Sequence, residues 1–367
     1  MRVMTVLGTR PEIIRLSRLI PQLDEACEHV LVHTGQNFDA ALSDIFFRDL
    51  GVRDPDLALG IRGASFGEQV AQLLVSIEQV MLQVRPDRLL ILGDTNSGLS
   101  ALIAKRLGIP VYHMEAGNRC YDDRVPEETN RRLIDHSSDV LLPYTERSRA
   151  NLLREGIDAQ RVYVTGNPIR EVIDAYRPRI DASTAFADLG VDPAAYFLVT
   201  IHRAENVDVP ARLRALAAGL QQVQAEYDLP MIVSLHPRTR DRLESLGLDL
   251  ESEGMRVMPP LGFFDFVALE EQAFCVLTDS GTVQEECCIL RVPAVTVRDV
   301  TERPETIECG SNVLSGADPE TIAMCVRAVT ERRREWTVPA EYLAESVSQT
   351  VLRIVVGYRY AASRTPC

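Results

Sequence analysis

The 367-residue sequence has almost no lysine, an excess of acidic side chains and no long apolar run. Lys105 is the only lysine among 39 basic residues, and 53 acidic residues give a formal net charge of -14. Binding to a nucleic-acid backbone requires a basic face, so this balance argues against a DNA or RNA partner. No segment reaches the ~20 consecutive apolar residues of a membrane-spanning helix, so no membrane association is expected.

The cysteine spacing and the first residues bear on the redox compartment. Eight cysteines are scattered without a C-x-x-C pair, so no metal site is expected. The opening run MRVMTVLG is too short for the apolar part of a secretory signal and lacks a small-residue cleavage site. We therefore expect a cytoplasmic protein with reduced thiols. A disulfide between the adjacent Cys287 and Cys288 would be strained.

Glycine-rich nucleotide motifs are absent as well. Neither G-x-G-x-x-G nor G-x-x-x-x-G-K-[ST] occurs in the sequence. These motifs place a dinucleotide pyrophosphate or a triphosphate at the start of a helix. Their absence leaves a dinucleotide or P-loop site unsupported.

Short apolar runs alternate with amphipathic helical stretches, which is typical of βαβ units and parallel sheets. A chain of this length, 46% hydrophobic, exceeds one compact core, so two domains are expected. The expected strands are 2–7, 29–33, 89–92, 111–114, 140–142, 162–164, 197–201, 231–235, 256–258, 275–277 and 294–297. We predict an N-terminal domain at 1–170 and a C-terminal domain at 171–341. A helix within 342–367 is expected to cross back onto the first domain.

Polar residues that follow the strands are the site candidates, because ligands of open α/β sheets bind at the carboxyl ends of strands. Two such domains are expected to face a central cleft. After the first strand, Gly8-Thr9-Arg10-Pro11-Glu12 suits a capped helix start that leaves Arg10 available as an anion clamp. The alternative is an ordinary strand-turn-helix with a surface arginine.

Carboxylates directly follow two successive expected strands further along the chain. Asp94 comes directly after 89–92, and Glu115 directly after 111–114. A lone carboxylate at such a position is usually a helix cap, whereas two at successive strand ends favour acid–base chemistry. The following loop adds Glu127 and, four residues later on one helical face, Arg131. A solvated helix with an ordinary Glu–Arg pair is the alternative there.

The second half places histidines at two strand ends and a helix start after a third. His202 follows 197–201 and His236 follows 231–235, where an inert core role is less expected. Residues 278–286 form a strand end, a turn of small residues and a helix whose N-terminus suits a diphosphate. Glu285 or Glu286, about one turn further on, can accept both hydroxyls of a ribose. A capped helix without a ligand is the alternative.

Together these segments resemble the non-hydrolysing UDP-N-acetylglucosamine 2-epimerase family over essentially the whole chain. The motifs, in family order, are Gly8-Thr9-Arg10-Pro11-Glu12, Gly93-Asp94-Thr95, Glu115-Ala116-Gly117, Pro126-Glu127-Glu128-x-Asn130-Arg131, His202-Arg203, Thr278-Asp279-Ser280-Gly281 with Gln284-Glu285-Glu286, and Thr301-Glu302-Arg303-Pro304-Glu305. The resemblance implies an α/β fold of the GT-B type, with two Rossmann-like, doubly wound parallel-sheet domains. It also implies a UDP-sugar substrate held mainly by the second domain, no cofactor, and a homodimer.

Residue roles follow from the same resemblance, motif by motif. The implied catalytic set is Asp94, Glu115, Glu127, His202 and Arg131. The implied substrate and UDP contacts are Arg10, Arg15, Asn130, Arg203, His236, Ser280, Gly281, Glu286 and Arg303. Family enzymes eliminate UDP across C1–C2 to give a 2-acetamidoglucal and then add it back. Because no carbonyl activates the C2 proton, one carboxylate must remove it and another acid return it, which requires carboxyls with separated pKa values.

Three departures from the family pattern concern the substrate. Arg15 stands where many members have lysine, which replaces a point charge by a planar guanidinium. Residues 34–39 differ from the run that in some members holds an activating second UDP-GlcNAc molecule. Residues 115–131 look closer to a sub-branch that acts on UDP-linked 6-deoxy-N-acetylhexosamines and gives UDP-N-acetyl-L-fucosamine. The sugar therefore stays open between UDP-GlcNAc/UDP-ManNAc and a 6-deoxy relative.

Three other function classes fit parts of the pattern. A hydrolysing epimerase would release free ManNAc and UDP. A GT-B glycosyltransferase would share the architecture, but three acids in the first domain exceed what an acceptor base requires. A non-catalytic sensor would bind UDP without turnover, and the full set of acids argues against it.

Overall fold

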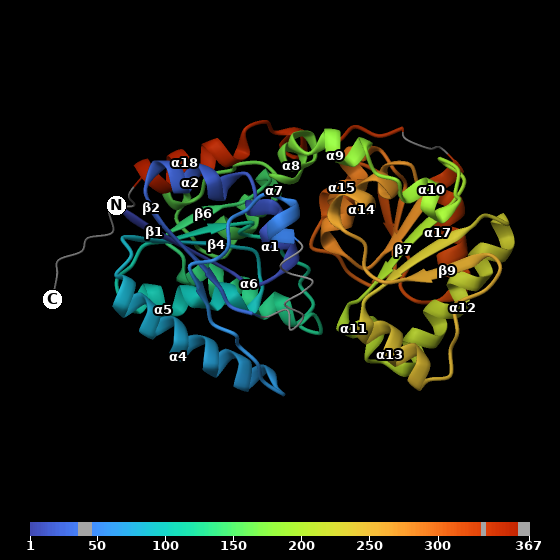
Figure 1. Cartoon of the computed structure of the whole chain (residues 1–367), viewed down its shortest axis with the longest axis horizontal. Coiled ribbons are helices and arrows are strands. Elements are labelled where there is room, and N and C mark those ends of the chain that lie inside the picture. The colour runs from blue at the N-terminus through green and yellow to red at the C-terminus, as the bar shows by residue number, and fades with distance from the viewer. Residues whose placement is uncertain (36–45, 332–334, 359–367) are drawn as a thin grey trace. The chain divides into compact units, whose positions relative to one another are not determined.

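The computed structural model describes residues 1–35, 46–331 and 335–358, which divide into two compact units (Figure 1). Unit 1 comprises residues 1–172 together with the segment that begins at Ala340, and unit 2 comprises Ile173–Pro339. Each unit has its own parallel sheet and its own apolar core. Among the described residues, no helix has both the length and the apolar character needed to cross a membrane.

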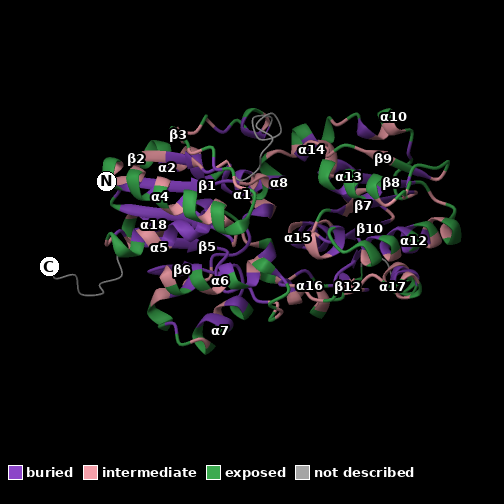
Figure 2. Ribbon diagram, turned by 90° about the horizontal axis from the view of Figure 1, so that it is seen from below, coloured by how far each residue is buried: buried purple, intermediate pink, exposed green. Residues whose placement is uncertain are grey.

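The described strands of unit 1 form one six-stranded parallel sheet in the order β3-β2-β1-β4-β5-β6. They are β1 (Arg2–Leu7), β2 (Glu28–His33), β3 (Leu57–Ala58), β4 (Arg88–Leu92), β5 (Val111–Met114) and β6 (Val140–Leu142). Every residue of β4, β5 and β6 is buried, as expected for parallel strands covered on both faces (Figure 2). The strand order reverses between β1 and β4, so the loops after these two strands leave the sheet at its switch point.

Helices connect these strands and cover both faces of the sheet. In chain order they are α1 (Arg10–Leu16), α2 (Leu19–Ala26), α4 (Phe66–Val84), η1 (Asn96–Leu99), α5 (Ser100–Arg106), α6 (Pro126–Ser137), α7 (Glu146–Arg154) and η2 (Ala159–Arg161). Helix α8 (Ile169–Ala175) spans the division between the units. Several of them begin with a Ser or Thr cap, as at Ser65 before α4 and Thr145 before α7.

The C-terminal segment returns to unit 1. It contains η3 (Ala340–Leu343) and α18 (Val347–Gly357), and α18 packs beside α2 (Figure 1). Two buried groups of the sheet reach this segment: the Arg88 guanidinium donates to the carbonyl of Val355, and the Tyr112 hydroxyl donates to that of Tyr358. The final helix is thus tied to the same sheet that carries the strand ends of the first half.

Unit 2 repeats the scheme with the described strand order β12-β11-β10-β7-β8-β9, again all parallel. The strands are β7 (Phe197–Ile201), β8 (Met231–Leu235), β9 (Met255–Met258), β10 (Cys275–Thr278), β11 (Ala294–Thr296) and β12 (Asn312–Leu314). The helices are α9 (Arg177–Asp181), α10 (Ala185–Leu189), α11 (Ala204–Val207), α12 (Pro210–Tyr227), α13 (Pro237–Ser245), α14 (Phe263–Glu271), α15 (Gly281–Leu290), α16 (Pro304–Glu308) and α17 (Pro319–Glu331). The order reverses between β7 and β10, which places the ends of these two strands at the switch point.

The structure corrects one expected strand. Residues 162–164 do not form a strand but only a single parallel bridge between Val162 and Leu141. The neighbouring strand β6 has three residues and is followed by Pro143, whose nitrogen carries no hydrogen to extend the ladder. Conversely, the short edge strands β3 and β12 were not expected, because two or three residues are too few to show an apolar period.

Candidate functional site

Glu115, directly after β5, is the most constrained of the expected acids. Its backbone adopts a left-handed conformation with φ 63°, which costs a non-glycine residue about 1 kcal/mol. The side chain is buried, and Oε2 accepts hydrogen bonds from Arg15 Nη1 at 2.8 Å and from the Tyr144 hydroxyl at 3.2 Å. Oε1 accepts from Asn118 Nδ2 at 3.3 Å. A turn of this shape aims the carboxylate away from the strand and fixes it before any ligand arrives.

Arg15, expected as a substrate contact, lies on α1 with its side chain 3% exposed. Besides its ion pair with Glu115, its guanidinium lies 5.7 Å from the centre of the Tyr144 ring. The planar guanidinium of Arg15 therefore contacts both the Glu115 carboxylate and the Tyr144 ring. Sequence reasoning had no signal for this partner, because the two residues are 100 positions apart.

Asp94, after β4, belongs to a second charged group on the same sheet edge. Arg131 Nε donates to Asp94 Oδ2 at 2.8 Å, and Arg131 Nη1 donates to Glu128 Oε2 at 2.7 Å. Asn130 Nδ2 donates to the backbone carbonyl of Asp94 at 3.0 Å. Two adjacent residues of α6, Asn130 and Arg131, thus hold the Asp94 loop, and Glu127 lies half-buried on the first turn of that helix.

Glu128, not among the expected site residues, organises the loop that leads into α6. Its carboxylate is fully buried and accepts from the backbone N–H groups of Cys120 at 3.0 Å and Tyr121 at 3.2 Å. Burial alone would raise the pKa of Glu128, but the Cys120 N–H and the Arg131 guanidinium outweigh it and lower the pKa. Glu128 is therefore a structural anion that positions Arg131.

A buried triad beneath both loops was also missed from the sequence. Asp135 on α6 accepts from the His113 ring at 2.9 Å, from Arg119 Nη1 at 2.8 Å and from the backbone N–H of Gly117 at 3.1 Å. The other His113 nitrogen contacts the carbonyl of Gly93 at 2.8 Å. Burial raises the pKa of Asp135, but His113 and Arg119 reverse the effect and lower it. One carboxylate thus joins the loops that carry Asp94 and Glu115.

The first motif forms a capping box at the start of α1, and its acid, Glu12, is buried. Glu12 Oε2 accepts from the backbone N–H groups of Gly8 at 3.0 Å and Thr9 at 2.8 Å, and Oε1 accepts from the Thr95 hydroxyl at 3.2 Å. Burial raises the pKa of Glu12 to about 7 in spite of these hydrogen bonds. Arg10, at the first position of α1, lies with its guanidinium 5.7 Å from the ring centre of Phe46. Burial lowers the pKa of Arg10.

In unit 2 the candidate residues gather around Asp279, which follows β10. Its buried carboxylate accepts from the backbone N–H groups of His202 at 3.0 Å and Arg203 at 2.9 Å, and from Asn206 Nδ2 at 3.0 Å. The Nδ1 atom of His202 lies 3.2 Å from Asp279 Oδ1, with the His202 side chain 45% exposed. Asp279 was recognised as part of a motif, yet its role is to hold the His202-Arg203 turn.

The start of α15 lies beside this turn. Ser280 is the N-cap, and a Cβ atom on Gly281 would come within 2.5 Å of Glu302 Oε1, so only glycine fits without displacing that carboxylate. Glu302 in turn accepts from Arg203 at 3.3 Å and from Arg298 at 2.9 Å. The first N–H groups of such a helix have no partner within the helix and, with its dipole, suit an anion.

The remaining candidates of unit 2 lie around this helix and the next strand end. Arg303 pairs with Glu285 at 2.5 Å, with both side chains buried. Glu286 is buried near Glu270, whose pKa is raised well above its usual range by burial and then by the charge of Glu286. His236 caps α13, and its Nδ1 accepts from the backbone N–H of Arg238 at 3.3 Å.

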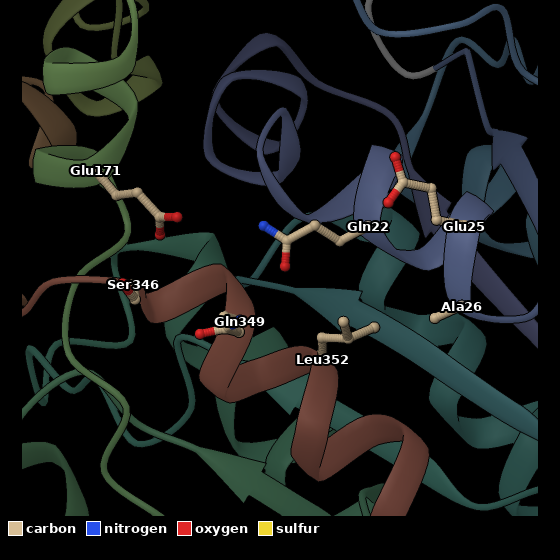
Figure 3. Close-up of a pocket in the computed structure, with 7 residues that line it drawn as sticks. All are labelled: Gln22, Glu25, Ala26, Glu171, Ser346, Gln349 and Leu352. Atoms are coloured by element: carbon tan, nitrogen blue, oxygen red, sulfur yellow. The ribbon is translucent and has the colours of Figure 1, made fainter.

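A surface hollow of about 450 Å³ lies elsewhere in unit 1, between α2, α8 and α18 (Figure 3). Its lining includes Gln22, Glu171 and Gln349, and the figure shows Gln22 and Glu171 pointing toward one another. None of the expected site residues lines it. Within the described ranges, no group of three or more His, Cys, Asp or Glu side chains is placed to hold a metal ion. Residues 36–39, part of the stretch that departs from the family's activator-binding run, lie outside the described residues.

Two doubly wound parallel sheets, each with polar and charged groups at its strand ends, define an α/β enzyme of the GT-B type. The family model for UDP-N-acetylglucosamine 2-epimerase matches residues 22–356. The chain belongs to the UDP-N-acetylglucosamine 2-epimerase family, and it is accordingly an isomerase.

Individual relatives agree with this membership. A UDP-N-acetylglucosamine 2-epimerase of Methanocaldococcus jannaschii is 41% identical over 350 residues, which cover 92% of this chain and 95% of the relative. A UDP-2,3-diacetamido-2,3-dideoxy-D-glucuronate 2-epimerase of Pseudomonas aeruginosa is 38% identical over 336 residues, 89% of this chain and 92% of the relative. The crystal structure of the M. jannaschii UDP-GlcNAc 2-epimerase in complex with UDP-GlcNAc and UDP has a TM-score of 0.92 at 39% identity, with 97% and 99% of the two chains covered.

Proposed function

We propose that this enzyme is a non-hydrolysing 2-epimerase that interconverts UDP-GlcNAc and UDP-ManNAc. The observation that supports the proposal is a pair of acids at the ends of the neighbouring strands β4 and β5. Glu115 forms an ion pair with Arg15, and Asp94 forms one with Arg131. Relatives named for this reaction cover nearly the whole chain. The proposed reaction needs two carboxyl groups, and Glu115 and Asp94 are the candidates in unit 1.

The proposed reaction has two halves. In the first, a carboxylate of unit 1 takes the C2 proton while the C1–O bond breaks, and UDP leaves with the bonding electrons to give a 2-acetamidoglucal. In the second, an oxygen of the UDP β-phosphate attacks C1, and a second acid delivers a proton to the other face of C2. Asp94, Glu115 and Glu127 are the candidate proton-transfer groups, with Arg131 and His202 assisting.

We propose that unit 2 binds the nucleotide. The N-terminus of α15 at Ser280 and Gly281 would take the diphosphate, where negative charge develops as UDP departs. Glu286 would accept the ribose hydroxyls, and Arg203, His236 and Arg303 would complete the anion contacts of unit 2. In unit 1, Arg10 and Asn130 are proposed substrate contacts. These assignments predict that variants in the acids of unit 1 keep their affinity for UDP.

A second candidate substrate is a more heavily modified UDP-hexosamine. The P. aeruginosa relative, at 38% identity, is named for a diacetamido uronate, and residues 115–131 resemble the 6-deoxy sub-branch. The test is a substrate panel followed by proton NMR without acceptor or added cofactor: UDP-GlcNAc, a UDP-6-deoxy-N-acetylhexosamine and the diacetamido uronate. Fastest turnover of UDP-GlcNAc to UDP-ManNAc supports the proposal, and turnover of another sugar alone reassigns the substrate. Release of free sugar and UDP would identify hydrolysis instead.

We also propose that the enzyme is a homodimer. Helix α4 exposes Val75 and Leu82, which are seven residues apart and therefore lie on one helical face, with exposed fractions of 58% and 56%. Sedimentation equilibrium tests this assembly, and a single species of the chain mass at micromolar concentration would contradict it.

A further inference from the structure

Two cysteines of unit 2 face each other across neighbouring helices. The Sγ atoms of Cys288, on α15, and Cys309, directly after α16, lie 3.6 Å apart. Cys288 is fully buried, whereas Cys309 is only partly buried. The adjacent Cys287 points elsewhere, because its thiol donates to Glu270 Oε1 at 3.2 Å. The structure thus pairs Cys288 with a residue 21 positions away rather than with its neighbour in sequence.

The surroundings make the two thiols chemically unequal. The Cys288 thiol hydrogen-bonds to Cys309, and this contact, together with Ser311 and in opposition to burial, lowers the pKa of Cys309 to about 6. The same contact and burial raise the pKa of Cys288. Cys309 is therefore the more acidic and less buried of the two thiols, and the lower pKa favours it as the nucleophile.

We propose that Cys309 and Cys288 are a site of reversible oxidation by a hydroperoxide, with Cys309 attacked first and Cys288 resolving the product into a disulfide. The Cys309 thiolate attacks the peroxide oxygen, which breaks the O–O bond and releases water (or an alcohol), leaving a sulfenic acid. The Cys288 sulfur then attacks the Cys309 sulfur and displaces a second water. Two thiols lose two protons and two electrons in total, and the peroxide takes them up as it is reduced.

The geometry requires only a small movement. A disulfide bond is about 2 Å long, so the sulfurs need to approach each other by about 1.5 Å from their present 3.6 Å. A second link already holds the same two helices: Glu285, one turn before Cys288 on α15, pairs with Arg303, the N-cap of α16. Arg303 and Cys309 lie at opposite ends of α16. The ion pair already joins the first end to α15, and the disulfide would join the second.

The only tryptophan of the chain can report the event. Trp336 Nε1 donates to the backbone carbonyl of Cys288 at 3.1 Å. Oxidation would replace the Cys288 thiol near the indole by a disulfide, and the two groups quench tryptophan fluorescence to different extents. We therefore expect the emission of Trp336 to change on oxidation and to return on reduction with dithiothreitol.

The test is titration of the full-length reduced protein with hydrogen peroxide, followed by thiol counting under denaturing conditions and peptide mapping. We expect the loss of two thiols per chain, a linked peptide pair containing Cys288 and Cys309, and full recovery with dithiothreitol. C27S is the matched control: Cys27 is partly buried like Cys309, but burial raises its pKa. This variant should lose the same two thiols as the wild type.

Two variants separate the roles of the sulfurs. C288S should accumulate a Cys309 sulfenic acid that dimedone traps, because the resolving thiol is gone. C309S should form no intramolecular disulfide and leave Cys288 unmodified. A linked peptide between other cysteines, or an intramolecular disulfide formed by Cys288 in C309S, would overturn the proposal. So would a wild-type protein that keeps all its thiols at a peroxide dose that modifies free cysteine.

Discussion

Arg15 Nη1 lies 2.8 Å from Glu115 Oε2, and both side chains are buried at the carboxyl edge of the first sheet. A buried carboxylate with one arginine and a tyrosine hydroxyl as donors is held in position before substrate binds. The proposed reaction moves a proton at an unactivated carbon, and a carboxylate held in this way would need no reorganisation of water to take part in that transfer. The pair thus connects the packing of unit 1 with the proposed chemistry.

Removing the charge at Glu115 should abolish turnover but not nucleotide binding. We expect E115Q and D94N each to lower kcat by about 100-fold or more, because general acid–base groups contribute at least that factor. The affinity for UDP, measured by isothermal titration calorimetry, should stay within a few-fold of wild type. E25Q, at an exposed position of α2, is the control. Turnover within tenfold of wild type would remove the substituted residue from the catalytic set.

Replacing Arg15, which breaks its ion pair with Glu115, should destabilise the protein. R15M leaves the Glu115 carboxylate buried without its cation, which costs about 3 kcal/mol in the free energy of unfolding. The double variant R15M/E115M removes both charges and should recover most of that loss. Urea denaturation followed by circular dichroism measures both values. A double variant less stable than R15M would show that the pair does not account for the effect.

Glu12 predicts a specific pH dependence of stability. Its pKa is raised from 4.5 to about 7 by burial, so the folded state holds the proton more tightly than the unfolded state. The stabilising contribution is therefore complete below pH 4.5 and is lost as the pH rises through about 7, by about 3 kcal/mol. The difference in unfolding free energy between wild type and E12Q should shift by that amount between these pH values. A difference that does not change with pH would contradict the assignment.

Gly281 provides a steric test of the proposed diphosphate site. In G281A the added Cβ would lie 2.5 Å from Glu302 Oε1, and Glu302 is held by Arg203 and Arg298, so the start of α15 must shift. We expect UDP affinity to fall by about tenfold, or about 1.4 kcal/mol. The matched control is G262A, at the N-cap of α14, where a Cβ meets no atom within 4 Å. Equal UDP affinity of the two variants would remove the α15 terminus from the nucleotide site.

The positions of most strands along the chain, and the residues that follow them, could be read from the sequence because buried parallel strands are mainly apolar. Asp94, Glu115 and His202 were found in this way, as polar residues that directly follow such runs. Their supports were not: His113 lies inside an apolar strand and Asp135 on the inner face of a helix, where no local period marks a polar partner. Long-range pairs such as Arg15–Glu115 and Cys288–Cys309 depend on the folded chain and leave no trace in local spacing.

The most direct test of the account follows the C2 position of the sugar. Wild-type enzyme and E115Q are each incubated with UDP-GlcNAc in deuterium oxide, without acceptor or added cofactor, and the anomeric and H2 signals are followed by proton NMR. The account predicts that wild type forms UDP-ManNAc with deuterium at C2, while E115Q binds UDP but exchanges no proton. Epimerisation that retains the original hydrogen at C2 would contradict it.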